Sequence, residues 1–215
     1  MNEANPLVSS WNPLEILQVQ RLENLTDGIF AVAMTILVFD LKPLDGPVGD
    51  LPSNFVHLWP NFLGYIISFL LLGIYWHGHL SQFRHIRKID PTYIWIHILF
   101  FMSISLVPFT TSSLSQYPFS LLTLALYASN LILIGCVLYA MWSYATNGHR
   151  FIDDNVPPEV IRYGKIRCLL APAGYVIALC VALVSPVLAL IVFVIVPVVY
   201  IVPGFHSFWV KLTAG

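Results

Sequence analysis

The stretch PTYIWIHILFFMSISLVPFT, residues 91–110, opens the longest part of the sequence that contains no Asp, Glu, Lys or Arg. That part extends to His149, and two further charge-free stretches cover Leu51–Phe83 and Cys168–Val210. A helix needs about 20 predominantly apolar residues to cross a bilayer, so each stretch has room for one or two spans. These stretches predict an all-α integral membrane protein.

Composition supports the same class of protein. Of the 215 residues, 58% are hydrophobic and 10% are charged, whereas about 25% are charged in ordinary soluble domains. The net charge of −1 offers no broad basic field for nucleic acid. Cys136, Cys168 and Cys180 show no paired spacing, which indicates packing residues and neither a disulfide nor a metal site. We therefore expect the lipid bilayer as a partner, and no nucleic acid.

The rest of the chain is divided by its polar segments. Asn12-Pro13 is a helix start, because Asn caps free amides and Pro fits the first helical position. Residues 1–20 lack the pattern of a signal peptide, so we expect a retained cytoplasmic segment before a six-helix membrane domain over residues 21–215. Asp40–Asn54 is expected to be a loop. The predicted spans are Pro13–Leu41, Phe55–His77, Thr92–Thr111, Phe119–Tyr144, Cys168–Val184 and Val187–Val202, the last two joined at Ser185-Pro186.

The basic residues predict the orientation, because Lys and Arg of short loops stay on the cytoplasmic side. With the N-terminus inside, Lys42 alone lies outside. Nine basic residues then lie inside: Arg21, Arg84, Arg87, Lys88, Arg150, Arg162, Lys165, Arg167 and Lys211. Both termini are therefore expected in the cytoplasm.

Three charged residues mark the start of the first span. Asp27 lies at its apolar boundary, where an ionisable group usually has a partner or a function. Arg21 is about 240° away around the helix, so it should pair with another helix or chain. Glu23 and Asp27 are four residues apart and share a face. If that face turned toward a pore axis, several copies would form an acidic ring that enriches cations at the inner mouth.

Other polar residues give weaker indications. His77 and His79 fall on different sides of a helix, and no nearby Cys or carboxylate completes a metal site. The hydroxyls of the third span have no nucleophile elbow, and no glycine-rich loop could bind a nucleotide. We therefore predict neither an enzyme nor a cofactor site.

The segment Arg21-Leu-Glu-Asn-Leu-Thr-Asp-Gly28 resembles the first-helix motif Arg-x-x-x-Phe-Ser-Asp-Gly of the prokaryotic relatives of the endolysosomal potassium channel, transmembrane protein 175. Thr26 keeps the hydroxyl of the motif serine, whereas Leu25 replaces its ring. The resemblance covers roughly Arg21–Pro118. Its further matches are Trp76, His79, Phe83, Asp90, Leu106-Val-Pro108-Phe109 and Tyr117-Pro118.

The resemblance implies a homotetrameric, potassium-permeable channel whose pore is lined by the first helix of each subunit. Carried over to this chain, the apolar constriction and its nearby Thr are Val32, Thr35, Ile36 and Phe39, which share one helical stripe. Periodicity cannot choose that stripe, because a second stripe is equally apolar. That second stripe is Phe30, Met34, Leu37 and Leu41. The resemblance also implies a structural lock, formed by Arg21, Thr26, Asp27, Gly28, Trp76 and His79.

We therefore expect a homotetrameric channel for monovalent cations, with K⁺ as the permeant ion, in a prokaryotic cytoplasmic membrane. One alternative is a proton-coupled carrier for cations or small solutes that uses Asp27 with His77 or His79 as a relay. A second alternative is a membrane scaffold without transport.

Overall fold

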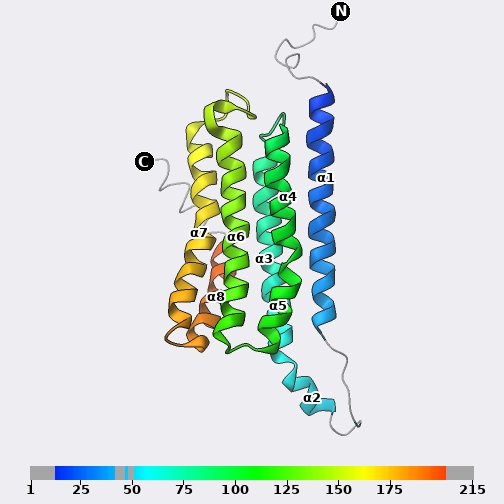
Figure 1. Cartoon of the computed structure of the whole chain (residues 1–215), viewed down its shortest axis with the longest axis vertical. Helices are drawn as coiled ribbons and strands as arrows, with labels where there is room; N and C mark the ends of the chain where they lie inside the picture. Colours follow the sequence, from blue (N-terminus) through cyan, green and yellow to red (C-terminus); the bar gives the residue numbers. More distant parts are fainter. Residues whose placement is uncertain (1–12, 42–46, 48–50, 202–215) are drawn as a thin grey trace, which may run out of the picture.

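A computed structural model describes residues 13–41, 47 and 51–201, and the regular elements of that part are helices. Successive long helices stand side by side and run in opposite directions (Figure 1). The elements are α1 Pro13–Ile36, η2 Leu37–Asp40, α2 Leu51–His57, α3 Trp59–Phe83, α4 Pro91–Ser105, α5 Val107–Gln116, α6 Leu121–Thr146, η4 Asn147–His149, α7 Pro158–Ala182 and α8 Pro186–Ile201.

Five helical stretches of this part are long and apolar enough to cross a membrane. They are Leu17–Asp40, Trp59–Phe83, Pro91–Gln116, Leu121–His149 and Pro158–Ala182. The sixth apolar helix, α8, is shorter, with 16 residues. The expected all-helical membrane architecture is thus confirmed, with five full-length apolar spans.

The third span is not one regular helix. It consists of α4 and α5, which meet at Leu106, two residues before Pro108. Proline has no N–H to donate, and its ring clashes with the carbonyl four residues earlier, so a helix bends or breaks there. Helical bonding resumes at once, because the Thr110 amide donates to Leu106 O at 3.0 Å.

Several predicted boundaries were wrong. α7 begins at Pro158, ten residues before the predicted Cys168, because its charged first turns are helical although they are too polar for a bilayer core. Likewise, α3 continues to Phe83, six residues beyond the predicted end at His77. The expected loop before the second span ends early, because α2 is helical from Leu51. The start of α1 at Pro13 is as predicted, so the last residues of the segment 1–20 are helical.

The last two helices form the hairpin expected from Ser185-Pro186. The Ser185 amide donates to Val181 O at 2.8 Å, and its hydroxyl accepts from the Leu188 amide at 3.4 Å. A side chain at Gly174 would come within 2.8 Å of Val196 on α8. The small residues of α7 therefore let α8 approach closely, as the sequence predicts.

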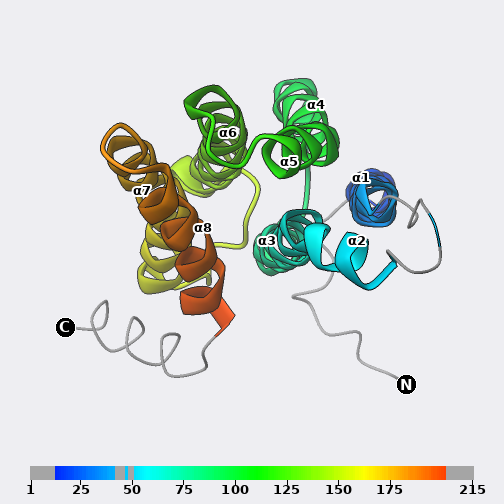
Figure 2. The same ribbon diagram turned by 90° about the horizontal axis from the view of Figure 1, so that it is seen from below.

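α1 occupies an edge of the molecule. It packs against α3, α4 and α5, and the group formed by α6, α7 and α8 lies on the far side of these helices (Figure 2). Phe30 of α1 packs against Phe100 of α4, with ring centroids 5.9 Å apart. One side of α1 is therefore part of the core, and the opposite side is uncovered.

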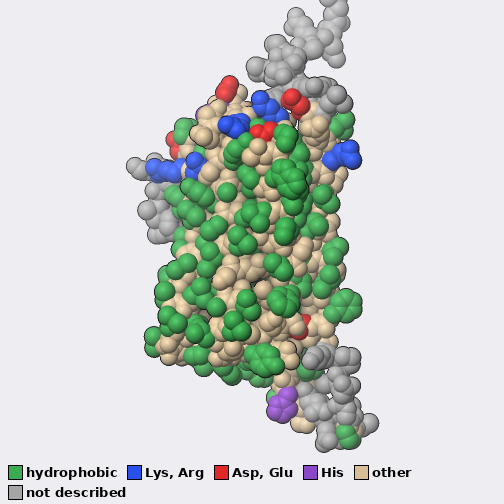
Figure 3. Space-filling model, in the orientation of Figure 1, with side chains coloured by type: hydrophobic (Ala, Val, Ile, Leu, Met, Phe, Trp, Pro, Cys, Tyr) green, Lys and Arg blue, Asp and Glu red, His purple; other side chains and the backbone are tan. Residues whose placement is uncertain are grey.

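Basic side chains gather at one end of the molecule, where α1 begins and where the α3–α4 and α6–α7 connections lie (Figure 3). These two connections are joined, because Ile86 pairs with Ile152 in a β-bridge and Arg87 forms an ion pair with Asp153 at 2.9 Å. We call this the basic end. Lys42 and Lys211, which also entered the orientation argument, lie outside the described residues.

Candidate ion pathway and the first helix

The inner face of α1 is buried against the other helices. Phe30 is 2% exposed, and Ala33 and Leu37 are buried as well. The stripe that rivals the expected constriction therefore points into the chain at Phe30 and Leu37, with Met34 half-buried beside them. Its fourth residue, Leu41, is also half-buried.

The expected constriction residues lie on the opposite face. The exposed fraction is 57% for Val32, 42% for Ile36 and 80% for Phe39, and Thr35 is exposed between them. Such a row of apolar side chains on the surface of the chain is typical of a face that contacts lipid or another protein chain. The structure thus separates two stripes that are indistinguishable in sequence.

Thr35 is the polar member of this row. Its hydroxyl donates to the carbonyls of Ala31 and Val32, both at 2.9 Å. Because one hydroxyl hydrogen serves both carbonyls, the lone pairs of the oxygen are left free of the helix. The Thr35 oxygen can therefore present partial negative charge to an ion or a water molecule beside α1.

Asp27 joins the first helix to the second span. The Trp76 indole of α3 donates to its Oδ1 at 2.8 Å. Thr26, beside it, is fully buried and its hydroxyl donates to Leu22 O at 2.8 Å, inside its own helix. Asp27, Thr26 and Trp76 of the expected lock therefore meet where α1 contacts α3.

His79 does not join this group. It is 1% exposed, and its Nε2 lies 3.1 Å from Nε2 of the fully buried His97 on α4. The expectation that Asp27 would be held by His79 was therefore wrong, since Trp76 takes that place. His77 instead lies 3.1 Å from an Arg167 nitrogen of α7. Within the described residues, no group of three His, Cys, Asp or Glu side chains could hold a metal ion.

Arg21 and Gly28 lie on the outer face of α1. Arg21 is exposed and its guanidinium has no hydrogen bond or ion pair with any described residue. A Cβ added at Gly28 would meet nothing within 4 Å. Neither residue is thus accounted for by contacts with the described part of the chain.

Glu23 is on the other side of the helix from the constriction residues. It precedes Val32 by nine residues, about 900° or two and a half turns, so the two side chains point in opposite directions. Accordingly Glu23 is half-buried, whereas Val32 is exposed. An acidic ring of Glu23 and a constriction at Val32 cannot both face one axis. Arg21, eleven residues before Val32, is on the same side as the constriction.

Sequence reasoning missed a buried polar chain between the second, third and fourth spans. The Thr111 hydroxyl of α5 donates to Ser68 Oγ of α3 at 2.7 Å, and Ser68 lies 2.9 Å from the Tyr127 hydroxyl of α6. His97, the partner of His79, was missed too. The only available signal was a polar residue within a charge-free span, which does not identify its partner.

Comparisons with known proteins agree with this architecture. The profile of the family described as "Endosomal/lysosomal potassium channel TMEM175" matches residues 21–108. A potassium channel from Streptomyces collinus is 30% identical over 178 residues, which cover 79% of this chain and 85% of that relative.

Two further relatives extend the comparison. The human endosomal/lysosomal proton channel TMEM175 is 33% identical over 95 residues, 40% of this chain and 19% of that protein. The crystal structure of a lysosomal potassium-selective channel TMEM175 homolog from Chamaesiphon minutus superimposes with a TM-score of 0.76 at 23% identity, covering 85% of this chain and 96% of that one. The chain therefore belongs to the TMEM175 family.

Proposed function

We propose that the chain is a potassium-permeable cation channel that works as a homotetramer, with α1 of each subunit lining the pore. The observation that carries this proposal is the outward-facing row of Val32, Ile36 and Phe39. Relatives named as potassium channels, such as that of Streptomyces collinus, support the choice of ion.

The neighbours of this row favour another subunit over lipid. Arg21 and Gly28 lie on the same face of α1. Arg21 lies near the start of α1 in the basic end, where it can reach water or headgroups, so it fits either neighbour. A glycine without neighbours in its own chain offers room for a second helix to approach closely. The open space at Gly28 is explained if the outer face of α1 packs against a copy of itself.

The constriction consists of apolar layers formed by Val32, Ile36 and Phe39. A narrow apolar ring cannot replace the hydration shell of an ion, so it resists passage by dewetting until it widens. The Thr35 oxygen supplies the polar contact on the same stripe. This mechanism uses only side chains of the chain and the permeant K⁺, so the proposal includes no cofactor.

In the proposed topology, both termini lie in the cytoplasm and the basic end faces inward. The basic side chains at one end support this orientation. α8 serves as the sixth span, although its 16 residues extend only about 24 Å, less than a bilayer core of about 30 Å. Local thinning of the bilayer compensates for such a mismatch. A prokaryotic cytoplasmic membrane is the proposed location.

Flux measurements on the purified chain in liposomes test this function. A K⁺ gradient should drive passive K⁺ flux that follows the gradient, whereas a carrier would saturate and move protons with its substrate. A scaffold would give no flux. Because the human relative is named a proton channel, a pH-sensitive dye should be recorded in the same vesicles. Proton flux without K⁺ flux would overturn the choice of ion.

A further inference from the structure

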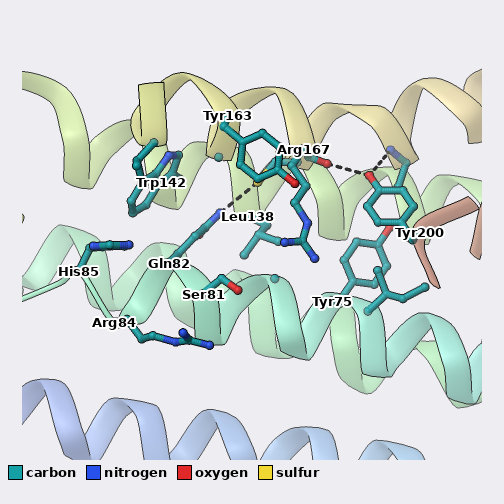
Figure 4. Close-up of a pocket in the computed structure, with 16 residues that line it drawn as sticks. Tyr75, Ser81, Gln82, Arg84, His85, Leu138, Trp142, Tyr163, Arg167 and Tyr200 are labelled. Atoms are coloured by element: carbon teal, nitrogen blue, oxygen red, sulfur yellow. Dashed lines mark hydrogen bonds between the residues drawn. The ribbon is translucent and has the colours of Figure 1, made fainter. Parts of the chain in front are cut away.

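A cavity of ≈ 310 Å³ lies between α3, α6, α7 and α8, across α3 from the first helix (Figure 4). Its walls include Gly78 and Gln82 of α3, Leu138 and Trp142 of α6, and Arg167 of α7. We propose that this cavity binds the headgroup and the adjoining chain segment of an anionic phospholipid. The inference needs the chain to be embedded in a membrane and does not depend on ion permeation through α1.

The α7 wall of the cavity contains an opened helical turn that is bridged by a side chain of α8. The Tyr200 hydroxyl donates to Arg167 O at 2.7 Å and accepts from the Ala171 amide at 3.0 Å. In a regular helix this amide and this carbonyl would bond each other directly. Pro172, the next residue, has no N–H to continue the ladder. The Tyr200 hydroxyl therefore bonds both backbone groups of the opened turn. A side chain inserted in this way bends a helix and leaves no backbone hydrogen bond unmade there.

Glycines at two positions shape the walls of the cavity. The indole edge of Trp142 packs onto Gly164, where a Cβ would collide with the ring nitrogen, and that nitrogen donates to Ile161 O of α7 at 3.0 Å. A Cβ at Gly78 would reach Leu138 only at 3.5 Å, ordinary van der Waals contact. The volume of ≈ 310 Å³ is at the lower end of the range of ligand pockets. It suits a headgroup with the adjoining part of one acyl chain and not a whole lipid.

The ionisable groups at the cavity include basic side chains and no acidic ones. Arg84, His85 and Arg167 line it, and none of the lining residues is Asp or Glu. Arg167 extends from α7 toward α3, where its guanidinium meets His77, a side chain that supplies no negative charge. The Arg84 guanidinium forms no hydrogen bond or ion pair with the described residues. Two guanidinium groups thus line the cavity, and no carboxylate lines it beside them.

This arrangement selects an amphiphilic anion. Guanidinium groups bind phosphate oxygens with charge-assisted hydrogen bonds, and basic pockets between membrane helices are typical sites for acidic lipid headgroups. The remaining wall is apolar where it faces the bilayer interior, with Ile74, Leu138 and Ala171. A soluble anion would use only the basic part, whereas a phospholipid matches both parts.

The test is lipid binding to the purified full-length chain in detergent, followed by native mass spectrometry. The probes are phosphatidylglycerol, phosphatidylcholine with the same acyl chains, and glycerol 3-phosphate as a soluble headgroup. We expect phosphatidylglycerol to bind most tightly. Arg84→Gln and Arg167→Gln should each weaken it about fivefold, equivalent to about 1 kcal/mol. Lys165→Gln removes the same charge from α7 outside the cavity lining and should bind like the unmodified chain.

A second variant leaves the charges intact. Gly78→Leu fills the apolar part of the cavity and should weaken both lipids alike. Unchanged phosphatidylglycerol preference in the Arg84→Gln, Arg167→Gln double variant would overturn the proposal, as would glycerol 3-phosphate binding as tightly as the lipid. If the double variant does not fold, Gly78→Leu decides, since unaltered lipid binding in that variant also overturns the site.

Discussion

The Trp76 indole nitrogen donates to the Asp27 carboxylate across 2.8 Å and thereby connects α3 to α1. This side-chain hydrogen bond spans the two helices directly. It fixes the rotation of α1, because turning the helix would pull Asp27 away from the indole. The side of α1 that carries Val32 and Ile36 is thus kept facing away from the subunit.

Replacing either partner should therefore loosen the first helix. Trp76→Phe keeps the ring but removes the N–H, and Asp27→Asn keeps an acceptor but removes the charge. We expect each variant to lower the stability of the fold by about 1 kcal/mol and to reduce the tetramer fraction in size-exclusion chromatography. The double variant should lose little more than each single one, because both act on one bond. If Asp27→Asn assembles and conducts normally, the bond has no locking role.

The proposed constriction predicts a leak when its apolar layer becomes polar. Ile36→Asn would place four amides at the narrow part of a tetrameric pore, wet it and raise flux with less discrimination between K⁺ and Na⁺. If Ile36 instead faced lipid, the same change would cost roughly 1–3 kcal/mol per chain and open no path. Liposome flux at matched tetramer amounts distinguishes the two.

The control for this experiment must be exposed and lie off the stripe. Leu37 is only 1% exposed, so Leu37→Asn would disturb the core. Val38 is 46% exposed and β-branched like Ile36, and it lies about half a turn further round. Val38→Asn should leave the flux at the level of the unmodified chain. Equal leaks from both variants would remove the stripe from the ion pathway.

Substitutions at Gly28 distinguish an effect on the stability of one chain from an effect on tetramer assembly. Since a Cβ at this position meets nothing within 4 Å, Gly28→Ala should stabilise the isolated subunit by up to about 1 kcal/mol through helix propensity. Gly28→Leu should leave the subunit folded but lower the tetramer fraction, because a neighbouring helix would no longer fit. Circular dichroism melting and cross-linking measure the two effects. Full tetramer yield with Gly28→Leu would place this face against lipid.

For Glu23 we predict no contribution to the conductance of the channel. Because it points away from the side of Val32, Glu23→Gln should not change single-channel conductance, in contrast to the acidic-ring hypothesis. Bilayer recordings at low ionic strength, where screening is weakest, give the most sensitive comparison. A clear fall in inward conductance would show that α1 rotates or bends in the assembled channel.

Asp90 predicts the acid sensitivity of the basic end. It caps α4 by accepting from the Tyr93 amide at 2.7 Å, and it accepts from the Tyr144 hydroxyl at 2.7 Å, with Arg150 nearby. Its partial burial raises the pKa, but the hydrogen bonds from Tyr144 and Tyr93 and the charge of Arg150 outweigh this effect. The pKa of Asp90 therefore lies below its ordinary value.

A carboxyl with a lowered pKa in the folded state stabilises the fold above its unfolded pKa of about 3.9. This contribution is lost as the pH falls through the folded pKa. Asp90→Asn retains the helix cap without the charge, so its melting temperature should fall less than that of the unmodified chain between about pH 5 and pH 3. Asp154→Asn, an exposed carboxyl in the α6–α7 connection, is the control. Parallel melting curves for all three proteins would exclude Asp90 as an acid-sensitive support.

The sequence by itself determined the class of fold and the place of the candidate site. Charge-free stretches such as Leu51–Phe83 predict helices, because in lipid every backbone group must be bonded within its own segment. The motif from Arg21 to Gly28 predicts the family, since its residue types and spacing are local. The ends of α7 and α3 were misplaced because charged or polar turns can stay helical outside the bilayer core.

Only the tertiary structure decided which face of α1 is outward. Val32 and Phe30 are equally apolar, and lipid is as apolar as a protein core, so the hydrophobic pattern does not distinguish inside from outside in a membrane. The same holds for the partners of polar residues. Trp76 binds Asp27 while His79 binds His97, a choice set by the rotation of α3 against two neighbouring helices, and helix rotation depends on packing across the whole bundle.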